Sequence, residues 1–192
     1  MVSVIISTLN SERTLVPTLA MLVAGAMRGL VREVIVSDGG STDATVEVAD
    51  VAGCTVFPAQ GPLGARLKAA AAAARAPWLM FLRAGTVLDA TWLDETARFI
   101  DEAGRAADAG SAAVFRQIVS ARSRYPVLRE TLGLIGFGLF GRAHPRQGLL
   151  IAARLYREMG GHREDAADPE AELIRRLGRR RLVMLRSGAQ DS

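Results

Sequence analysis

The segment from Val34 to Thr45, VIVSDGGSTDAT, carries residue types suited to binding a ligand at the end of a strand. Asp38 follows an apolar run and can accept hydrogen bonds from a base or a ribose, while Gly39 and Gly40 allow a tight turn and close approach of the backbone to a ligand. The helix expected next presents its N-terminus, where anions bind. The alternative is a turn and helix cap without a ligand.

A second segment, WLMFLRAGTVLD from Trp78 to Asp89, ends an apolar run with a cation instead of an acid. Residues 78–82 predict a buried strand, and open α/β sheets bind ligands at the carboxyl ends of such strands. The side chains at that end belong to Arg83, Ala84 and Gly85. Because no carboxylate comes before Asp89, an anionic ligand here would have to be held by something other than a carboxylate-bound metal.

The elements that would position these side chains alternate between strands and helices. Apolar β-branched runs predict strands, and a 3.6-residue apolar period or an alanine-rich stretch predicts helices. In chain order the pattern predicts strand 2–7, a helix from about 15 to 27, strand 33–37, helix 44–52, strand 54–58, helix 63–75 and strand 78–82. This alternation predicts an α/β fold with a mostly parallel sheet and helices on both faces.

Beyond Asp89 the regular alternation ends. The pattern predicts a helix from about 90 to 103, a strand over 112–119, an apolar segment with several glycines over 125–140, a strand over 147–152, helices over 154–159 and 170–177, and a last strand near 182–185. No repeat of fixed period is visible.

Composition narrows the class of protein. A chain of 192 residues is long enough for one well-buried core. The net charge is +4, but the basic residues are scattered, Lys68 is the only lysine, and aromatic residues do not interleave with them, so nucleic-acid binding is not expected. Cys54 lies in an apolar run and predicts a buried strand thiol in a reducing compartment. We expect a cytoplasmic protein, because no leader pattern and no apolar run of about 20 residues is present.

Three weaker motifs carry little chemistry. GFGLFG, residues 136–141, matches the Gly-x-Gly-x-x-Gly pattern of dinucleotide sites but lacks the strand-turn-helix context, so close packing or contact with a membrane surface is favoured. His144 and His162 have no partner at metal-ligand spacing and predict surface or packing histidines. The arginine cluster within 175–181 is typical of a solvated helix end, with attraction to anionic lipid as the alternative.

Four blocks in order resemble the family 2 glycosyltransferases, which have the nucleotide-sugar-binding GT-A fold. They are VSVIISTLN, EVIVSDGGSTDAT, GPLGARLKAAAAAARAPWLMFL, and QGLLIAARLYREMGGHRE with ELIRRL. The nearest subgroup contains small bacterial enzymes whose fourth strand ends in His-Ala-Asp-Thr, where this chain has RAGT from Arg83 to Thr86. The resemblance implies one domain over 1–192, with a nucleotide-binding half over about 1–89 and an acceptor half over about 90–192.

The resemblance also implies roles for particular residues. Thr8, Asn10 and Asp38 would line the nucleotide pocket, with Asp38 facing the base and the backbone at Gly39 close to the ligand. Arg66 would lie near the base or the diphosphate.

On the acceptor side the resemblance implies that Glu170, in DPEAELIRRL, is the base that deprotonates the acceptor. The usual Glu-Asp pair is replaced there by Pro169 and Glu170. Glutamate can act as a general base, but its extra methylene moves the carboxylate, and small misplacements are costly in catalysis.

A further departure concerns the metal. In the family, acids after the fourth strand hold a divalent ion on the diphosphate, and neither Arg83 nor Gly85 offers a side-chain oxygen. We therefore expect Arg83, assisted by Arg66 and Lys68 on the preceding helix, to supply the positive charge, with Mg²⁺ or Mn²⁺ bound weakly. Asp89 could fold back to this point or cap the next helix.

These observations lead to one main hypothesis and two alternatives. The main hypothesis is an enzyme that transfers a sugar from a nucleotide-diphosphate donor to an unknown acceptor with inversion. The first alternative is a non-catalytic nucleotide-sugar-binding or interaction protein that has lost the metal site, in which Arg83 is a solvated strand-end residue. The second is a nicotinamide-dependent oxidoreductase, which would rest on GFGLFG alone.

Overall fold

The computed structural model describes residues 1–58, 61–105, 110–118 and 147–191. Their elements in chain order are β1 (Val2–Thr8), α1 (Glu12–Met27), β2 (Val31–Asp38), α2 (Thr45–Val51), β3 (Thr55–Pro58), α3 (Leu63–Ala73), β4 (Trp78–Arg83), β5 (Thr86–Leu88), α4 (Trp92–Arg105), β6 (Ala112–Gln117), β7 (Leu149–Ala152), α6 (Ala153–Glu158), α7 (Pro169–Leu177) and β8 (Leu182–Asp191). The described part is therefore an α/β structure, as the sequence predicts.

One sheet contains all of these strands, in the order β3-β2-β1-β4-β7-β6-β8-β5. The strands β1 to β4 pair in parallel, which confirms the parallel sheet predicted for the first half of the chain. Beyond β4 the sheet is mixed, because β7 runs antiparallel to both β4 and β6 while β6 and β8 are parallel.

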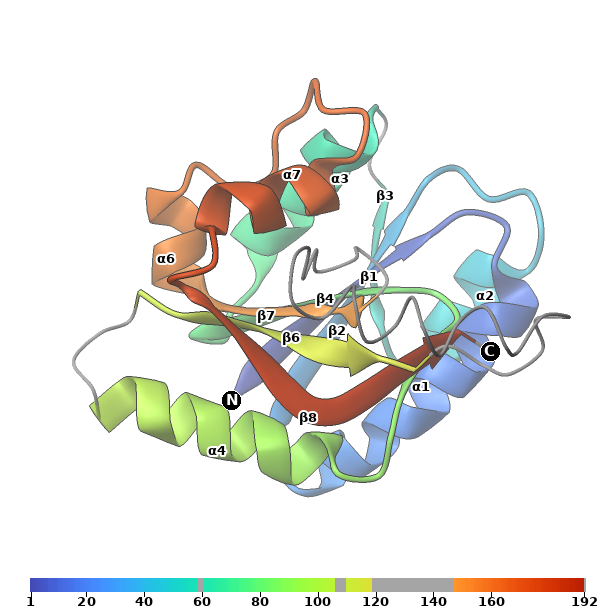
Figure 1. Ribbon diagram of the computed structural model, residues 1–192. Helices are drawn as coiled ribbons and strands as arrows, with labels where there is room; N and C mark the ends of the chain where they lie inside the picture. Colours follow the sequence, from blue (N-terminus) through green and yellow to red (C-terminus); the bar gives the residue numbers. More distant parts are fainter. Residues whose placement is uncertain (59–60, 106–109, 119–146, 192) are drawn as a thin grey trace, which may run out of the picture.

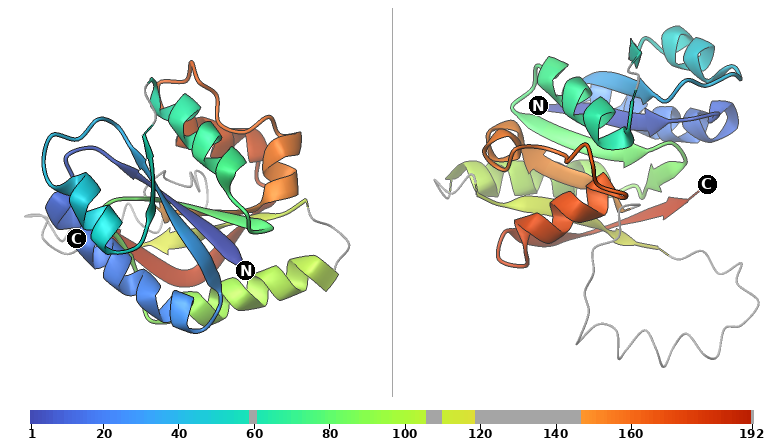
Figure 2. Two further views of the ribbon diagram at one scale, coloured as in Figure 1. Left: turned by 180° about the vertical axis from the view of Figure 1, so that it is seen from behind. Right: turned by 90° about the horizontal axis from the view of Figure 1, so that it is seen from above.

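The strand order reverses direction between β1 and β4. The chain adds β2 and then β3 on one side of β1, and returns through α3 to place β4 on the other side. Figures 1 and 2 show α1 and α2 on one face of the sheet, with α3, α6 and α7 on the opposite face. Open α/β sheets bind ligands at the carboxyl ends of strands beside such a reversal.

Strand register brings three predicted site residues to that edge. Thr8 pairs with Asp38 across β1 and β2, and Ser7 pairs with Arg83 across β1 and β4. Thr8, Asp38 and Arg83 therefore end three adjacent strands at one edge of the sheet.

The centre of the sheet is the hydrophobic core. The apolar residues Val4, Ile5 and Ile6 of β1 and Leu79 and Met80 of β4 are fully buried. Both strands are covered on two faces, which explains why their sequences read as unbroken apolar runs instead of alternating ones. Burial of each large side chain contributes roughly 1.5–3 kcal/mol to folding, so these strands hold the edge residues rigidly.

The structure differs from the sequence prediction at several places. The three-residue strand β5 was not predicted, and β8 extends to Asp191, well past the predicted end. Cys54 lies one residue before β3 and is half-buried, so it is not the buried strand thiol that was expected. The apolar segment 125–140, GFGLFG and His144 lie outside the described residues.

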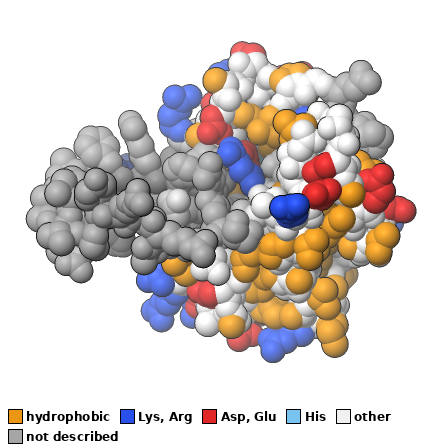
Figure 3. Space-filling model, turned by 90° about the vertical axis from the view of Figure 1, so that its right-hand side faces the viewer, with side chains coloured by type: hydrophobic (Ala, Val, Ile, Leu, Met, Phe, Trp, Pro, Cys, Tyr) orange, Lys and Arg blue, Asp and Glu red, His pale blue; other side chains and the backbone are white. Residues whose placement is uncertain are grey.

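The side of the molecule formed by α1 and α2 displays apolar side chains (Figure 3). Exposed members include Val16, Val23 and Met27 on α1 and Val46 and Val51 on α2. None of the helices in the described ranges is both long enough and apolar enough to span a bilayer.

Candidate functional site

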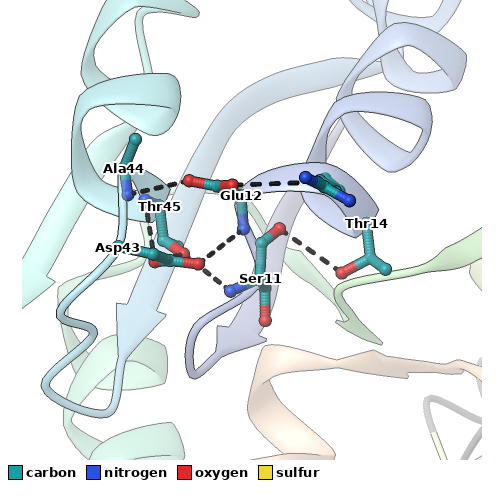
Figure 4. A network of polar contacts seen from close by, with 7 residues as sticks. Ser11, Glu12, Thr14, Asp43, Ala44 and Thr45 are labelled. Atoms are coloured by element: carbon teal, nitrogen blue, oxygen red, sulfur yellow. Dashed lines mark hydrogen bonds and ion pairs between the residues drawn. The ribbon is translucent and has the colours of Figure 1, made fainter.

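The N-termini of α1 and α2 cap one another in the loops that follow the carboxyl ends of β1 and β2 (Figure 4). The Asp43 carboxylate accepts hydrogen bonds from the backbone N–H groups of Glu12 at 3.2 Å and Thr45 at 3.1 Å. In return the Glu12 carboxylate accepts from the N–H of Ala44 at 3.2 Å. Helix N-termini leave such N–H groups without intrahelical partners, so this exchange fixes the two loops relative to each other.

Asp38 directs its carboxylate into its own loop. It accepts hydrogen bonds from the Thr8 hydroxyl and from the N–H groups of Gly40 and Ser41, each at 2.8 Å, and from the Ser41 hydroxyl at 2.5 Å. Burial alone would raise the pKa of Asp38, but these hydrogen bonds outweigh it and hold the pKa below the usual range. Asp38 is thus an ionised anchor of the loop.

Asn10 links the β1 loop to the β2 loop from the other side. Its amide oxygen accepts from the N–H of Thr42 at 2.9 Å, and its own N–H donates to the Ser41 hydroxyl at 2.8 Å. Asn10 has a φ of 49°, a left-handed conformation that asparagine tolerates better than most residues. Ser41 and Thr42 were not predicted as site residues, although their place in the glycine-containing loop is the signal that could have identified them.

Arg66 brings a buried positive charge beside Gly39. Its Nη1 donates to the Ser37 carbonyl at 3.1 Å, its Nε has no hydrogen-bond partner in the described ranges, and the residue is 9% exposed. A Cβ at position 39 would lie only 3.1–3.2 Å from the two Nη atoms. Glycine at this position therefore gives the guanidinium room at the end of β2.

Arg83 is bonded to Glu170. The Nε of Arg83 lies 2.5 Å from Oε2 of Glu170, its Nη2 also contacts that oxygen, and Nη2 lies 3.6 Å from the Asp168 carboxylate. Arg83 ends β4, and Glu170 lies in the first turn of α7, where Asp168 is the N-cap that accepts from the N–H of Ala171. The structure therefore joins the predicted charge donor and the predicted base in one ion pair.

Glu170 is in an unusual environment for a carboxylate, because it is only 5% exposed. Burial raises the pKa of Glu170, and the attraction of Arg83 offsets part of that rise while Asp168 adds to it. A carboxylate with a raised pKa is a stronger base than a free one, which suits proton acceptance.

The turn after β4 does not fit a divalent metal. Ala84 and Gly85 donate their N–H groups to the Ser7 carbonyl at 3.1 Å and the Thr18 hydroxyl at 3.0 Å. Asp89 accepts from the N–H of Gly188 at 2.6 Å and from Thr91 at the start of α4, so it serves as a helix cap. Within the described ranges, no three His, Cys, Asp or Glu side chains are grouped so that they could hold a metal.

Lys68 lies apart from this ion pair. Its Nζ is 3.4 Å from the Glu164 carboxylate, and its side chain lines a groove between α3 and α6. A role for Lys68 in binding the diphosphate of a donor stays a prediction.

A buried polar pair supports the loop before α7. The Tyr156 hydroxyl lies 2.8 Å from Nδ1 of His162, and the backbone N–H of His162 donates to the same hydroxyl at 3.1 Å. The His162 ring also packs edge-on against Phe81 of β4, with ring centroids 4.7 Å apart. His162 is therefore a packing histidine, one of the two alternatives that its sequence context predicted.

A strand reversal, a glycine-containing loop at the carboxyl edge of the sheet and a buried arginine beside that loop together form an arrangement at which open α/β sheets bind ligands. The model of the family described as Glycosyl transferase family 2 matches residues 3–151. The chain therefore belongs to Glycosyl transferase family 2, a membership that supports sugar transfer as the general class of reaction. Among curated protein sequences, none matches the chain significantly.

Two solved structures share the fold. Glucosyl-3-phosphoglycerate synthase from Mycobacterium tuberculosis, solved with Mn²⁺, UDP and glucosyl-3-phosphoglycerate, aligns with a TM-score of 0.68 at 19% identity over 100% of this chain and 72% of that one. S. aureus TarS 1–349 in complex with UDP-GlcNAc aligns with a TM-score of 0.71 at 17% identity, over 100% of this chain and 58% of that one. These similarities confirm the predicted GT-A-like fold.

Proposed function

We propose that the protein transfers a sugar from a nucleotide-diphosphate donor to an acceptor hydroxyl with inversion at the sugar carbon. The observation that carries this proposal is the Arg83–Glu170 pair, which lies at the carboxyl edge of the sheet beside the strand reversal. It combines a cation suited to a leaving diphosphate with a buried carboxylate suited to deprotonating an acceptor.

The donor would lie over the ends of β1, β2 and β4. The guanidinium of Arg66, next to the Gly39 backbone, offers hydrogen-bond donors to the base or the diphosphate. Thr8, Asn10 and Asp38 would act mainly by holding the loop in shape, because the Asp38 carboxylate already accepts four hydrogen bonds. Such pre-organisation reduces the entropy cost of binding.

In the transfer step Glu170 would take the proton of the acceptor hydroxyl while the acceptor oxygen attacks the anomeric carbon. The bond from that carbon to the donor phosphate breaks, and the nucleoside diphosphate leaves with the electron pair. Arg83 would share its charge between the departing phosphate and Glu170, which stabilises the developing negative charge. No step is assigned to the metal usual in the family, because the described residues contain no group of three metal-binding side chains.

A second candidate is a protein that binds nucleotide sugars without transferring them. It is favoured by the same ion pair, because Arg83 is already neutralised by Glu170 and the turn after β4 lacks a carboxylate ligand. In that case nucleotides would bind but no sugar would be transferred.

The test is turnover by the purified chain with a panel of nucleotide-diphosphate sugars and hydroxyl acceptors. Released nucleotide is quantified with and without EDTA, and NMR reports the configuration of the product. We expect Glu170→Gln to lower turnover by a factor on the order of 10²–10⁴. The matched control is Glu164→Gln, which removes an exposed carboxylate just before α7.

Three outcomes decide between the candidates. Turnover that Glu170→Gln abolishes and Glu164→Gln preserves supports the transferase. Calorimetric binding of a nucleotide sugar without turnover supports the binding protein. Absence of both across the panel would reject the two candidates together.

A further inference from the structure

A groove of about 730 Å³ lies between α3 and α6, over the first residues of β4. Its walls are mainly small apolar side chains, and it falls within the size range of sites for small organic ligands, roughly 300–1,000 Å³. The apolar and aromatic lining residues are Ala71, Ala72, Ala74, Ala76, Pro77, Leu79, Ala153 and Tyr156. Figure 2 shows α3 and α6 on the same face of the sheet.

This groove is separate from the proposed transfer site. The groove reaches Pro77, just before β4, and Leu79, near the beginning of β4, whereas Arg83 is at the end of that strand. Four residues of extended strand separate Leu79 from Arg83 by about 13 Å. The register of Trp78 with Ala152 places the start of α6 at the same end of β4 as the groove.

The charged residues of the groove are all cations. Lys68, Arg75 and Arg157 line it, and no lining residue is an acid. Lys68 pairs with the exposed Glu164, and Arg75 pairs with Glu33 at 2.8 Å. In the described part of the chain, Arg157 makes no ion pair, although it lies on the solvent-exposed side of α6.

We propose that this groove binds a single alkyl chain that ends in a phosphate group. The alanine methyls and Leu79 would cover the chain, and Arg157 with Arg75 would bind the phosphate. Two observations carry the proposal. The side chains that line the groove are mostly small and apolar, which suits an alkyl chain. The lining contains three cations and no acid, and Arg157 among them has no ion-pair partner in the described residues, which favours an anionic end group. A guanidinium matches phosphate oxygens with paired N–H groups. The inference does not depend on sugar transfer.

The experiment is calorimetry of the full chain with hexyl, octyl and decyl phosphate below their micelle concentrations, without any nucleotide. We expect affinity to rise about fourfold for each added methylene. Arg157→Gln should weaken binding at least about tenfold, because a charged hydrogen bond is lost. The matched control is Arg154→Gln on the same helix, since Arg154 pairs with Glu158 and does not line the groove.

A second variant locates the ligand. Ala72→Trp places a large side chain in the groove from an exposed helix position and should abolish binding, whereas Ala24→Trp on the exposed face of α1 should leave it unchanged. Circular dichroism and urea unfolding verify that both variants are folded. Because no nucleotide is present in the alkyl phosphate titrations, a failed groove proposal and a failed transferase proposal give different results.

The proposal is overturned by any of four results. Inorganic phosphate binding as tightly as decyl phosphate would leave only an ion site. A neutral decyl glycoside binding equally well would remove the role of charge. Alkyl phosphate binding that persists in Ala72→Trp would place the ligand elsewhere. Absence of binding by the longest chain in the wild-type protein would reject the site.

Discussion

The guanidinium of Arg83 is bonded to the carboxylate of Glu170 across 87 residues of sequence, with Nε and Oε2 2.5 Å apart. The residue that ends β4 and a residue in the first turn of α7 therefore act as one electrostatic unit. Removing one partner changes the environment of the other, so the effects of the two substitutions should not be additive.

Arg83→Ala should destabilise the protein because it leaves a buried carboxylate without its partner. We expect the free energy of unfolding to fall by roughly 1–3 kcal/mol, a range that allows for the partial exposure of Arg83. Glu170→Gln in the Arg83→Ala background should restore part of that loss. Urea unfolding of both single variants and the double variant measures the coupling, and strictly additive losses would show that the pair contributes nothing to folding.

Donor binding should tolerate removal of metal. The described side chains at the end of β4 are cationic or apolar, so we expect nucleotide affinity to survive EDTA and to weaken as salt rises, because salt screens charge attraction. Arg83→Ala should reduce affinity by about 1.5–3 kcal/mol. Arg98→Ala, which removes an exposed arginine of α4, is the matched control in calorimetry. A strict need for Mg²⁺ or Mn²⁺, with Arg83→Ala unaffected, would contradict this expectation.

Asp38→Ala should weaken nucleotide binding through the loop that it holds. The variant loses four hydrogen bonds to the carboxylate, which we expect to cost about 2–3 kcal/mol of stability as well. Because hydrogen bonds lower the pKa of Asp38 in the folded state, its contribution is present above the unfolded value of 3.8 and is lost as pH falls below it. Asp50→Ala on the exposed face of α2 is the control, and unchanged affinity in Asp38→Ala would remove Asp38 from the site.

The sequence allowed the parallel half of the sheet to be predicted because unbroken apolar runs such as those of β1 and β4 specify strands buried on both faces. It could not show that β7 inserts antiparallel between β4 and β6, since that pairing depends on contacts between distant segments. β5 was missed because three residues are too short for any periodic pattern.

The candidate site was predictable by residue type but not by contact. Local motifs and the family resemblance placed Asp38 at a strand end and Glu170 at the start of a helix. The partners of these residues depend on the tertiary structure, so nothing in RAGT indicated that Arg83 would face Glu170. Likewise, Lys68 precedes β4 in the sequence. Its position on α3, which begins at Leu63, nevertheless places its side chain on the side of the helix that lines the groove.

His162 should make folding stability depend on pH in a window where few other groups titrate. The residue is 1% exposed, and burial together with the nearby Arg176 charge lowers the pKa of His162 from 6.5 to about 3. The unfolded chain therefore binds a proton between about pH 6.5 and 3 that the folded chain does not bind. Since the unfolded state holds more protons in this window, stability falls as pH decreases.

Between pH 7 and pH 5 this difference should cost about 2 kcal/mol of unfolding free energy. His162→Asn keeps a hydrogen-bonding side chain beside the Tyr156 hydroxyl but cannot titrate, so urea unfolding of this variant should lack that part of the pH dependence, whatever its stability at pH 7. His144→Asn, which removes the other histidine of the chain, is the control for histidine titration elsewhere. If the wild type and His162→Asn lose stability in parallel over this range, His162 titrates in the folded protein as it does in the unfolded chain. The assignment of a buried neutral imidazole beside Phe81 would then be wrong.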